Sequence, residues 1–327
     1  RAVDVNPDDI ASITVLKGPA AAALYGLRAA NGAIIITTKR GGAEGAGKGL
    51  HATFSSTYTF EQVNKTPALQ DQFTKGSGGI AAKYASTGSG SFGAQVDTLF
   101  WDPTQATPYN QYGEIIGKTA AANNSAAIPF EAYDNVEQFF RTGNTMENNL
   151  SLSGGGDKGG FRVSFGALNQ QGVVPLSDFK RFTTTLSGEM QISEKFSTAG
   201  SFTYVKSGGT RMQQGSNLSG LMLNILRTPI SFDNSNGSDD PTDPSAYILD
   251  DGSQRNYRGG IGYDNPYWSI NQNPFQDDVN RMYGYGEVSY SPWAWLKLTE
   301  RLGIDFYSDR RNQIFAINSR AVPDGQI

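Results

Sequence analysis

Seven segments of the chain alternate apolar and polar residues with a period of two, which predicts β-strands with one apolar and one polar face. The clearest is 181–192, where Phe182, Leu186 and Met190 alternate with polar or charged residues. Several segments reach the roughly 9–11 residues that a tilted strand needs to cross a bilayer. The predicted strands are 50–60, 148–154, 161–169, 181–192, 196–207, 282–291 and 294–308.

The links between these strands alternate between extended and short. Two links are long, 61–147 and 208–281, and the link 171–178 is of modest length. Every second link of an antiparallel sheet lies at the same end, so the turns gather at one end and the loops at the other. This polarity is typical of an outer-membrane barrel, and a soluble sandwich does not require it. The short turns are 155–160, 193–195 and 292–293.

Composition excludes several classes of function. The chain has 39 glycines in 327 residues and 18% charged residues, which suits either a β-sandwich or a transmembrane barrel. The chain has no cysteine and a single histidine, His51. These counts exclude disulfide scaffolds, Cys/His zinc sites and thiol catalysis. A net charge of -4 and a pI near 5.2 leave no basic footprint for nucleic acid. The apolar run at 33–36 is far too short for a membrane-spanning helix.

Residues 1–41 differ from the rest and predict a small mixed α/β unit. A β-branched run at 13–16 precedes an alanine-rich helix over 20–25, which Gly26 would cap. An Asn–Gly turn then leads into 33–38, which we expect to be a strand buried on both faces. Residues 42–49 form a Gly-rich linker.

Three stretches resemble one known family. DDIASITVLKGPAAAALYGLRAANGAIIITTKRG is similar to the end of the plug domain of TonB-dependent outer-membrane receptors, in the SusC/RagA branch of Bacteroidota. NNLSLSGGGDKGGFRVSFGALNQQGVV resembles an early barrel hairpin of that branch. NPYWSINQNPFQDDVNRMYGYGEVSY with WLKLTERLGIDFYSDRR resembles its later strands.

The resemblance implies a transmembrane antiparallel β-barrel of 22 strands with an α/β plug inside, of which this chain is an internal part. Residues 1–41 would be the C-terminal part of the plug, and 50–327 the N-terminal part of the barrel, with extracellular loops 61–147 and 208–281. The TonB box, the first half of the plug and the other strands of a complete receptor are not in this sequence.

The resemblance further implies a transporter of the outer membrane and not an enzyme. It would import oligosaccharides or oligopeptides, energised by the TonB–ExbB–ExbD complex, with a SusD-like lipoprotein as a lid and with outer-membrane lipid around it. Two alternatives remain open: a structural member of an outer-membrane complex, and a receptor for a metallophore or vitamin.

The family signature in the first unit predicts structural roles. It consists of Tyr25, Gly26, Arg28, Asn31 and Gly32. Glycine suits special backbone angles and Asn–Gly suits a turn. Arg28 could pair with a wall carboxylate such as Glu189.

Aromatic residues outside the strands are the candidate substrate-binding residues, because their rings suit stacking on sugars or packing against peptides. Packing within the loops, or against a partner protein, is the alternative. An apolar segment at 219–227 predicts a short helix that packs in the second long loop. The candidates are Trp101, Tyr109, Tyr257, Tyr263, Tyr267 and Trp268.

Other polar groups predict little chemistry. His51 lies on the polar face of the first strand, where we expect a wall residue and not a catalytic one. The acidic stretch DNSNGSDDPTD leaves open a calcium-binding loop, although Gly237 is at the wrong offset from Asp233 for an EF-hand. We therefore expect no catalytic residues, no resident metal and no cofactor beyond that loop calcium.

Overall fold

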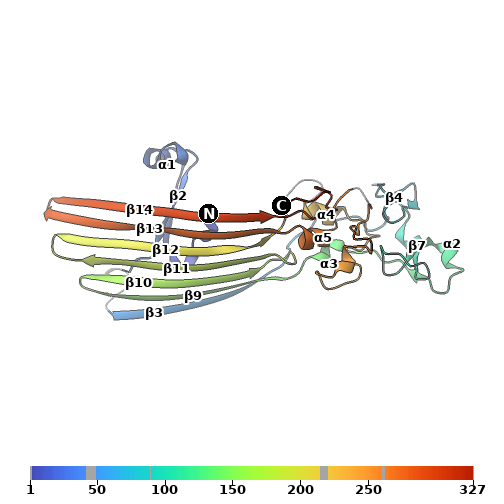
Figure 1. Cartoon of the computed structure of the whole chain (residues 1–327), viewed down its shortest axis with the longest axis horizontal. Coiled ribbons are helices and arrows are strands. Elements are labelled where there is room, and N and C mark those ends of the chain that lie inside the picture. Colours follow the sequence, from blue (N-terminus) through green and yellow to red (C-terminus); the bar gives the residue numbers. More distant parts are fainter. Residues whose placement is uncertain (1, 42–48, 89, 214–219, 260–261, 327) are drawn as a thin grey trace.

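The computed structural model describes residues 2–41, 49–88, 90–213, 220–259 and 262–326. A seven-stranded antiparallel sheet forms the body of the molecule, and its strands lie side by side in chain order (Figure 1). All seven predicted strands are present. They are β3 (Gly49–Glu61), β9 (Gly143–Gly156), β10 (Gly159–Gln171), β11 (Asp178–Gln191), β12 (Phe196–Arg211), β13 (Phe275–Trp293) and β14 (Leu296–Gln313).

The two ends of the sheet differ, as the alternating links predict. Short turns join β9 to β10, β11 to β12 and β13 to β14 at one end. Both long loops lie at the other end, where they form a separate mass of short elements (Figure 1). The loop-end link between β10 and β11 has only six residues, 172–177. We call the two ends of the sheet the turn end and the loop end.

The two faces of the sheet differ in polarity. On one face Leu186 lies opposite Phe202, while on the other Thr185 lies opposite Thr203. In the described part of the chain, no second sheet covers the apolar face. The exposed fractions of Phe182, Leu186 and Met190 are accordingly 46%, 47% and 54%.

Four strands extend further at the loop end than their apolar pattern predicts. β9 begins at Gly143, β12 continues to Arg211, β13 begins at Phe275 and β14 continues to Gln313. Backbone pairing continues there although the apolar alternation has ended and most side chains are polar, as in the ion pair between Arg211 and Asp277 at 2.9 Å. The predicted strand ends were therefore wrong. The period-two pattern ends where the apolar residues end, whereas the backbone hydrogen bonds between the strands continue beyond that point. The long loops are consequently 62–142 and 212–274.

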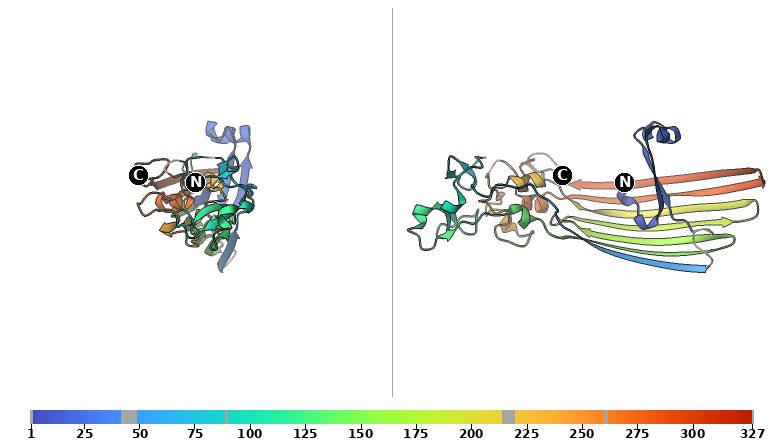
Figure 2. Two further views of the ribbon diagram at one scale, coloured as in Figure 1. Left: turned by 90° about the vertical axis from the view of Figure 1, so that its right-hand side faces the viewer. Right: turned by 180° about the vertical axis from the view of Figure 1, so that it is seen from behind.

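The N-terminal unit crosses the sheet at a steep angle (Figures 1 and 2). β1 and β2 pair as a two-stranded antiparallel ribbon, and α1 projects past the edge formed by β14. The predicted helix, its Gly26 cap and the second strand are present. The elements are η1 (Ala2–Asp4), η2 (Pro7–Asp9), β1 (Ile10–Leu16), α1 (Gly18–Tyr25), η3 (Leu27–Ala29) and β2 (Ala33–Thr38).

The prediction that 33–38 is buried on both faces is wrong for this structure. Ile34 is 67% exposed and Ile36 is 39% exposed. β2 pairs only with β1, and the described residues place no further layer over the ribbon. The predicted linker falls at 42–48, which lies outside the described residues, and at Gly49, which begins β3.

The first long loop builds its own small sheet. β6 pairs with β7 on one side and β8 on the other, and Trp101, Leu99 and Phe130 form its core. The elements of this loop are β4 (Gly76–Ser77), β5 (Ile80–Ala81), η4 (Val96–Thr98), β6 (Leu99–Asp102), β7 (Glu114–Gly117), α2 (Lys118–Ala121), β8 (Ile128–Pro129) and α3 (Asn135–Phe139).

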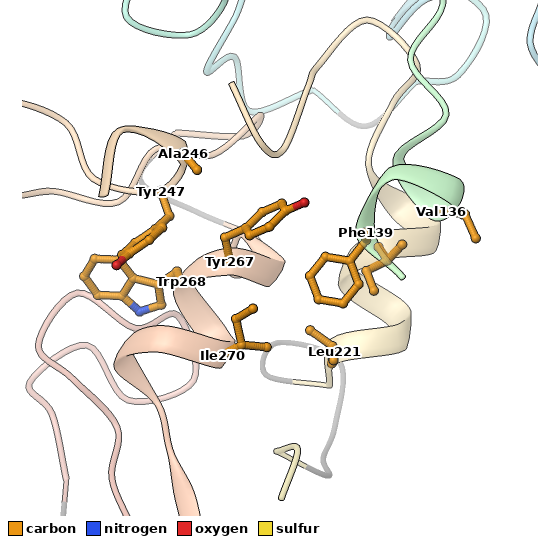
Figure 3. Close-up of a cluster of buried hydrophobic side chains, with 9 residues drawn as sticks. Val136, Phe139, Leu221, Ala246, Tyr247, Tyr267, Trp268 and Ile270 are labelled. Atoms are coloured by element: carbon orange, nitrogen blue, oxygen red, sulfur yellow. The ribbon is translucent and has the colours of Figure 1, made fainter. Parts of the chain in front are cut away.

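The second long loop packs against the end of the first. Its elements are α4 (Leu221–Arg227), η5 (Pro244–Ala246) and α5 (Pro266–Gln272). Phe139 of α3, Ile225 of α4 and Tyr267 of α5 share one buried apolar cluster (Figure 3). The predicted helix at 219–227 is confirmed from Leu221 onward. Within the described ranges, no helix is both long enough and apolar enough to cross a membrane.

Candidate functional site

The polar face of the sheet holds the N-terminal segment 2–9 through a buried carboxylate. Asp9, at the end of η2, accepts from Arg162 Nη1 at 2.7 Å and from Ser164 Oγ at 2.7 Å with Oδ1. Its Oδ2 accepts from Thr185 Oγ1 at 2.9 Å. The side chains of Arg162 and Asp9 are only 8% and 6% exposed. Because both carboxylate oxygens are hydrogen-bonded, the burial of this charge is well compensated.

Asp4 and the backbone of the same segment bind the polar face nearer the loop end. Arg181 donates to the carbonyls of Val3 and Val5 at 3.0 and 3.2 Å, and it pairs with Glu147 at 2.7 Å. Asp4 is 1% exposed. It accepts from Ser207 Oγ at 3.1 Å and lies 3.6 Å from Arg281. Residues 2–9 are therefore fixed to strands from β9 to β13 by polar contacts.

A glycine lets the segment approach the sheet closely. Asn6 donates to Asn149 Oδ1 at 2.8 Å across the backbone of Gly166. A Cβ atom at residue 166 would lie 2.4 Å from Asn6 Nδ2, so any larger residue would displace Asn6. Arg40, after β2, adds a contact by lying 5.5 Å above the ring of Tyr285.

Some hydroxyl groups beneath this segment are buried without a protein partner in the described part of the chain. They belong to Thr183, Ser187 and Tyr285. Buried polar groups of this kind are commonly satisfied by water. A cavity of about 510 Å³ lies alongside, between the segment and the sheet, and Asp8, Arg40 and Ser153 are among its lining. The interface therefore combines firm carboxylate contacts with room for solvent.

The predicted signature residues lie at the far end of the ribbon. Gly26 has φ 73°, and its N–H donates to the carbonyl of Ala22 at the end of α1. Gly32 has φ 111°, and a Cβ there would lie 2.9 Å from the carbonyl oxygen of Leu16. Tyr25, Arg28 and Asn31 are exposed.

The predicted pair between Arg28 and Glu189 is not formed. Arg28 lies on η3, at the projecting tip of the ribbon, and its side chain is exposed. The ion pairs among the described residues do not include one between Arg28 and Glu189. The pair was predicted because both residues were expected to lie on polar surfaces that face each other. In the structure, Arg28 lies at the tip of the ribbon, away from the sheet. His51, by contrast, lies exposed on the polar face of β3, opposite Ser153, as expected of a wall residue.

The aromatic candidates of the loops occupy three different clusters. Most have buried side chains: the exposed fractions of Trp101, Tyr257, Tyr263, Tyr267 and Trp268 are 2%, 8%, 5%, 5% and 3%. Tyr109 is half-buried and lies against the third cluster. Trp268 also donates from Nε1 to Ser319 Oγ at 2.9 Å. The structure thus gives most of these rings a packing role, and only some of them border a cavity.

Arg255 holds the two long loops together. Its guanidinium is fully buried and donates to the carbonyls of Pro108 and Tyr109 in the first loop. In the second loop it donates to the carbonyls of Asp233 at 2.8 Å and Ala246 at 3.1 Å. Burial lowers the pKa of Arg255 to about 10, which leaves the guanidinium charged at neutral pH. Nothing in the sequence marked this residue, because its acceptors are backbone carbonyls.

A cavity of about 770 Å³ lies between the two long loops. Of the six aromatic candidates, the structure brings Trp101 and Tyr267 to this cavity, while the other four do not line it. Tyr112 and Tyr133 also face it. Its volume falls in the range of small-molecule sites, which is roughly 300–1,000 Å³. We call it the loop cavity.

The charged residues in the lining of the loop cavity are mostly acidic. Glu131, Asp233 and Asp239 face it, and Arg141 is the basic residue of the lining. Burial raises the pKa of Tyr267 to about 12, and the carboxylates of Asp233 and Asp239 add to that effect. Tyr267, Asp233 and Asp239 line the same cavity. Sequence reasoning missed Glu131, which belongs to no recognisable motif, and considered Asp239 only as part of the acidic stretch that left open a calcium-binding loop.

The acidic stretch that resembled a calcium loop satisfies its own backbone. Asp233 accepts from the N–H and Oγ of Ser235 at 2.8 and 2.9 Å, and from the N–H of Gly237 at 2.6 Å. Among the residues that the structure describes, no group of three or more His, Cys, Asp or Glu side chains could hold a metal ion.

Sequence comparison relates the chain to TonB-dependent receptors. No protein-family model matches it. It is 27% identical over 273 residues to the TonB-dependent receptor SusC of Bacteroides thetaiotaomicron. The aligned region covers 83% of this chain and 22% of SusC. It is 25% identical over 327 residues to the TonB-dependent receptor P39 of Formosa agariphila, covering 99% of this chain and 26% of P39. The chain thus spans about a quarter of the length of these relatives.

Comparison of structures gives the same relation at the level of the fold. The RagAB peptide importer in its closed-closed state matches with a TM-score of 0.62 and 20% identity, over 97% of this chain and 34% of that chain. Its open-open state matches with a TM-score of 0.63 over 95% and 33%. The large antiparallel sheet therefore resembles the corresponding part of that receptor, although here the sheet is not closed.

Proposed function

We propose that this chain, which is SusC/RagA-like in sequence and fold, is part of an outer-membrane receptor that imports nutrients through a barrel closed by a plug. One observation carries the proposal: segment 2–9 binds the polar face of a sheet whose opposite face is apolar and, within the described ranges, is not covered by a second sheet. Such a sheet suits a wall with lipid on one side and an aqueous lumen on the other.

The dimensions of the apolar face support a position in a bilayer. On β14, Leu296, Leu298, Leu302, Ile304 and Phe306 point to that face, and Glu300 interrupts the series. The span from Leu296 to Phe306 matches the roughly 9–11 residues of a tilted transmembrane strand. At the turn end Trp293 and Trp295 stack with ring centroids 5.4 Å apart. Tryptophan side chains near the end of a membrane-spanning strand are typical of the boundary between lipid and water. We place the turn end in the periplasm and the loop end outside the cell.

In this proposal the N-terminal unit is the C-terminal part of the plug. Its contacts with the wall are hydrogen bonds and ion pairs, which can break and re-form without covalent chemistry. The work of opening a path past the plug would come from the TonB–ExbB–ExbD complex, through parts of the receptor outside this chain. A SusD-like lipoprotein would cover the loops.

We propose oligosaccharides or oligopeptides as the imported substrates. The name of the RagAB neighbours supports peptides for those proteins, and the mixed aromatic and polar lining of the loop cavity suits either class. Substrate would enter at the loop end and meet the loop cavity before the plug.

Uptake by cells tests the function. A strain that lacks the gene encoding this chain should lose uptake of fluorescently labelled oligomers that the parent strain accumulates, and a plasmid copy should restore it. A strain without TonB should lose the same uptake. Equal accumulation with and without the gene, over a panel of glycan and peptide oligomers, would contradict the proposal.

A further inference from the structure

The loop cavity has ligand-binding groups that the fold itself does not use. Glu131 and Asp239 are exposed at its lining and have no hydrogen bond or ion pair among the described residues. The Tyr267 hydroxyl likewise has no partner there, and although the residue is only 5% exposed, its oxygen is not one of the fully buried atoms without a partner. The hydroxyl is therefore accessible to water or to a ligand in the cavity.

Arg141 is the one cation that the described residues contribute to the cavity lining, and its side chain also contacts a neighbouring loop. Arg141 donates from Nε to the carbonyl of Gly172 at 3.1 Å. Nearby Asp233 uses both carboxylate oxygens for its own turn. Two carboxylates thus outnumber the one guanidinium among the charged groups that a ligand could meet, beside the Tyr267 hydroxyl, the amides of Gln111 and Gln138 and the rings of Tyr112 and Tyr133.

The net charge of the two long loops is negative, which also favours a cationic ligand. The long loops 62–142 and 212–274 contain fourteen acidic and eight basic residues, whereas the whole chain has 31 acidic and 27 basic residues. Two of the loop cations, Lys75 and Arg255, are buried against backbone carbonyls. The negative charge of the chain is thus concentrated at the loop end, where it would attract cations and repel polyanions.

We infer that the loop cavity selects oligomers with protonated amino groups, whose ammonium groups Glu131 and Asp239 would bind. This assignment rests on the proposed import function and narrows it. Tyrosine rings beside carboxylates are well suited to ammonium groups, because ring faces and carboxylates both attract cations. Uronate or sulfated oligomers would be rejected. The ammonium groups could belong to amino sugars or to lysine side chains.

Binding to the intact receptor in nanodiscs tests the inference. The probes are a glucosamine hexamer and its fully N-acetylated form, and a lysine–glycine hexapeptide and its N-acetyllysine form. Each pair differs in charge and keeps the same backbone. Calorimetry at low salt and mildly acidic pH, where glucosamine amino groups are protonated and carboxylates are still ionised, should show at least tenfold tighter binding of the charged member of one pair. Added salt should reduce the difference.

Variants assign the effect to the cavity. Glu131→Gln and Asp239→Asn should each weaken binding of the charged probe by about two- to fivefold, as for exposed ion pairs. Tyr267→Phe keeps the ring and should weaken binding to a similar extent. Asp250→Asn removes the same charge from an exposed loop residue outside the cavity lining, and it should leave affinity unchanged.

The outcomes separate this inference from the import function. Equal binding of charged and N-acetylated probes, no binding of either charged probe, or an equal effect of Asp250→Asn would overturn the cavity assignment. Gene-dependent uptake of neutral oligomers would then still stand. The pair that shows the preference identifies the source of the ammonium groups.

Discussion

The carboxylate of Asp9 lies 2.7 Å from the guanidinium of Arg162, although 153 residues separate them in the chain. This ion pair joins the N-terminal unit to the middle of the sheet, and both partners are nearly inaccessible to solvent. In the proposed receptor it is a contact between plug and wall. It is therefore the natural point at which to test how firmly that unit is held.

Substituting one partner of this ion pair should destabilise the contact between segment 2–9 and the sheet more than substituting both partners. Asp9→Asn leaves the Arg162 charge buried without its counter-ion, which costs about 3–5 kcal/mol in comparable buried pairs. Asp9→Asn with Arg162→Gln should recover much of that loss. Hydrogen exchange of the amides of residues 2–9 in the intact receptor measures it, and additive effects of the two substitutions would contradict direct coupling.

Arg255 should be irreplaceable by lysine. Its planar guanidinium donates to carbonyls of both long loops, whereas an ammonium group has three donors and no fork geometry. We expect Arg255→Lys to lower loop stability by about 1–3 kcal/mol, because at least one buried carbonyl loses its donor.

The readout for Arg255 is proteolysis of the loops by a protease of broad specificity. Arg310→Lys is the matched control, because Arg310 is exposed at the loop end of β14. Faster cleavage in Arg255→Lys alone is expected. Identical cleavage of both variants would show that the guanidinium does not couple the loops.

Loop stability should rise with pH just above neutrality because of Lys75. Burial, and then the charge of Arg258, lower the pKa of Lys75 from 10.5 to about 8. Between these values the unfolded loop binds more protons than the folded loop, so the free energy of unfolding increases as the pH rises. Above pH 10 the buried tyrosines Tyr257 and Tyr267 oppose this trend, since burial raises their pKa to about 12.

Thermal unfolding of the loops between pH 8 and pH 9.5 measures the Lys75 effect. We expect a stabilisation of about 1 kcal/mol across that interval, given that the group is only partly shielded from solvent. Lys75→Met should remove the slope. A wild-type slope that persists in Lys75→Met would assign the titration to another group.

The sheet was predictable because its signal is local. Alternation in 181–192 reports a strand with one apolar face, and the order of long and short links reports which ends lie together. The same signal failed at Gly143 and Arg211, where the strands continue beyond the apolar alternation through mostly polar residues. It also failed at Ile34, where an apolar run predicted burial that the two-stranded ribbon does not provide.

The contacts that place the site were not predictable from one sequence. Asp9 and Arg162 are ordinary charged residues until the fold brings β10 beneath η2. The aromatic residues of the loops looked like ligand-binding residues, but loops of this length build cores of their own, and Trp268 and Tyr257 are buried there. Only the packed structure distinguishes Tyr267, which borders the loop cavity, from its neighbour in α5.

The most direct test of the account is the environment of successive residues along β14. The chain has no cysteine, so single cysteines at Leu302, Gly303, Ile304 and Asp305 can carry a fluorescent label in the reconstituted receptor. Quenchers attached to lipid chains should act at 302 and 304, and a water-soluble quencher at 303 and 305. Equal quenching of all four positions by the water-soluble quencher would contradict a wall that separates lipid from an aqueous lumen.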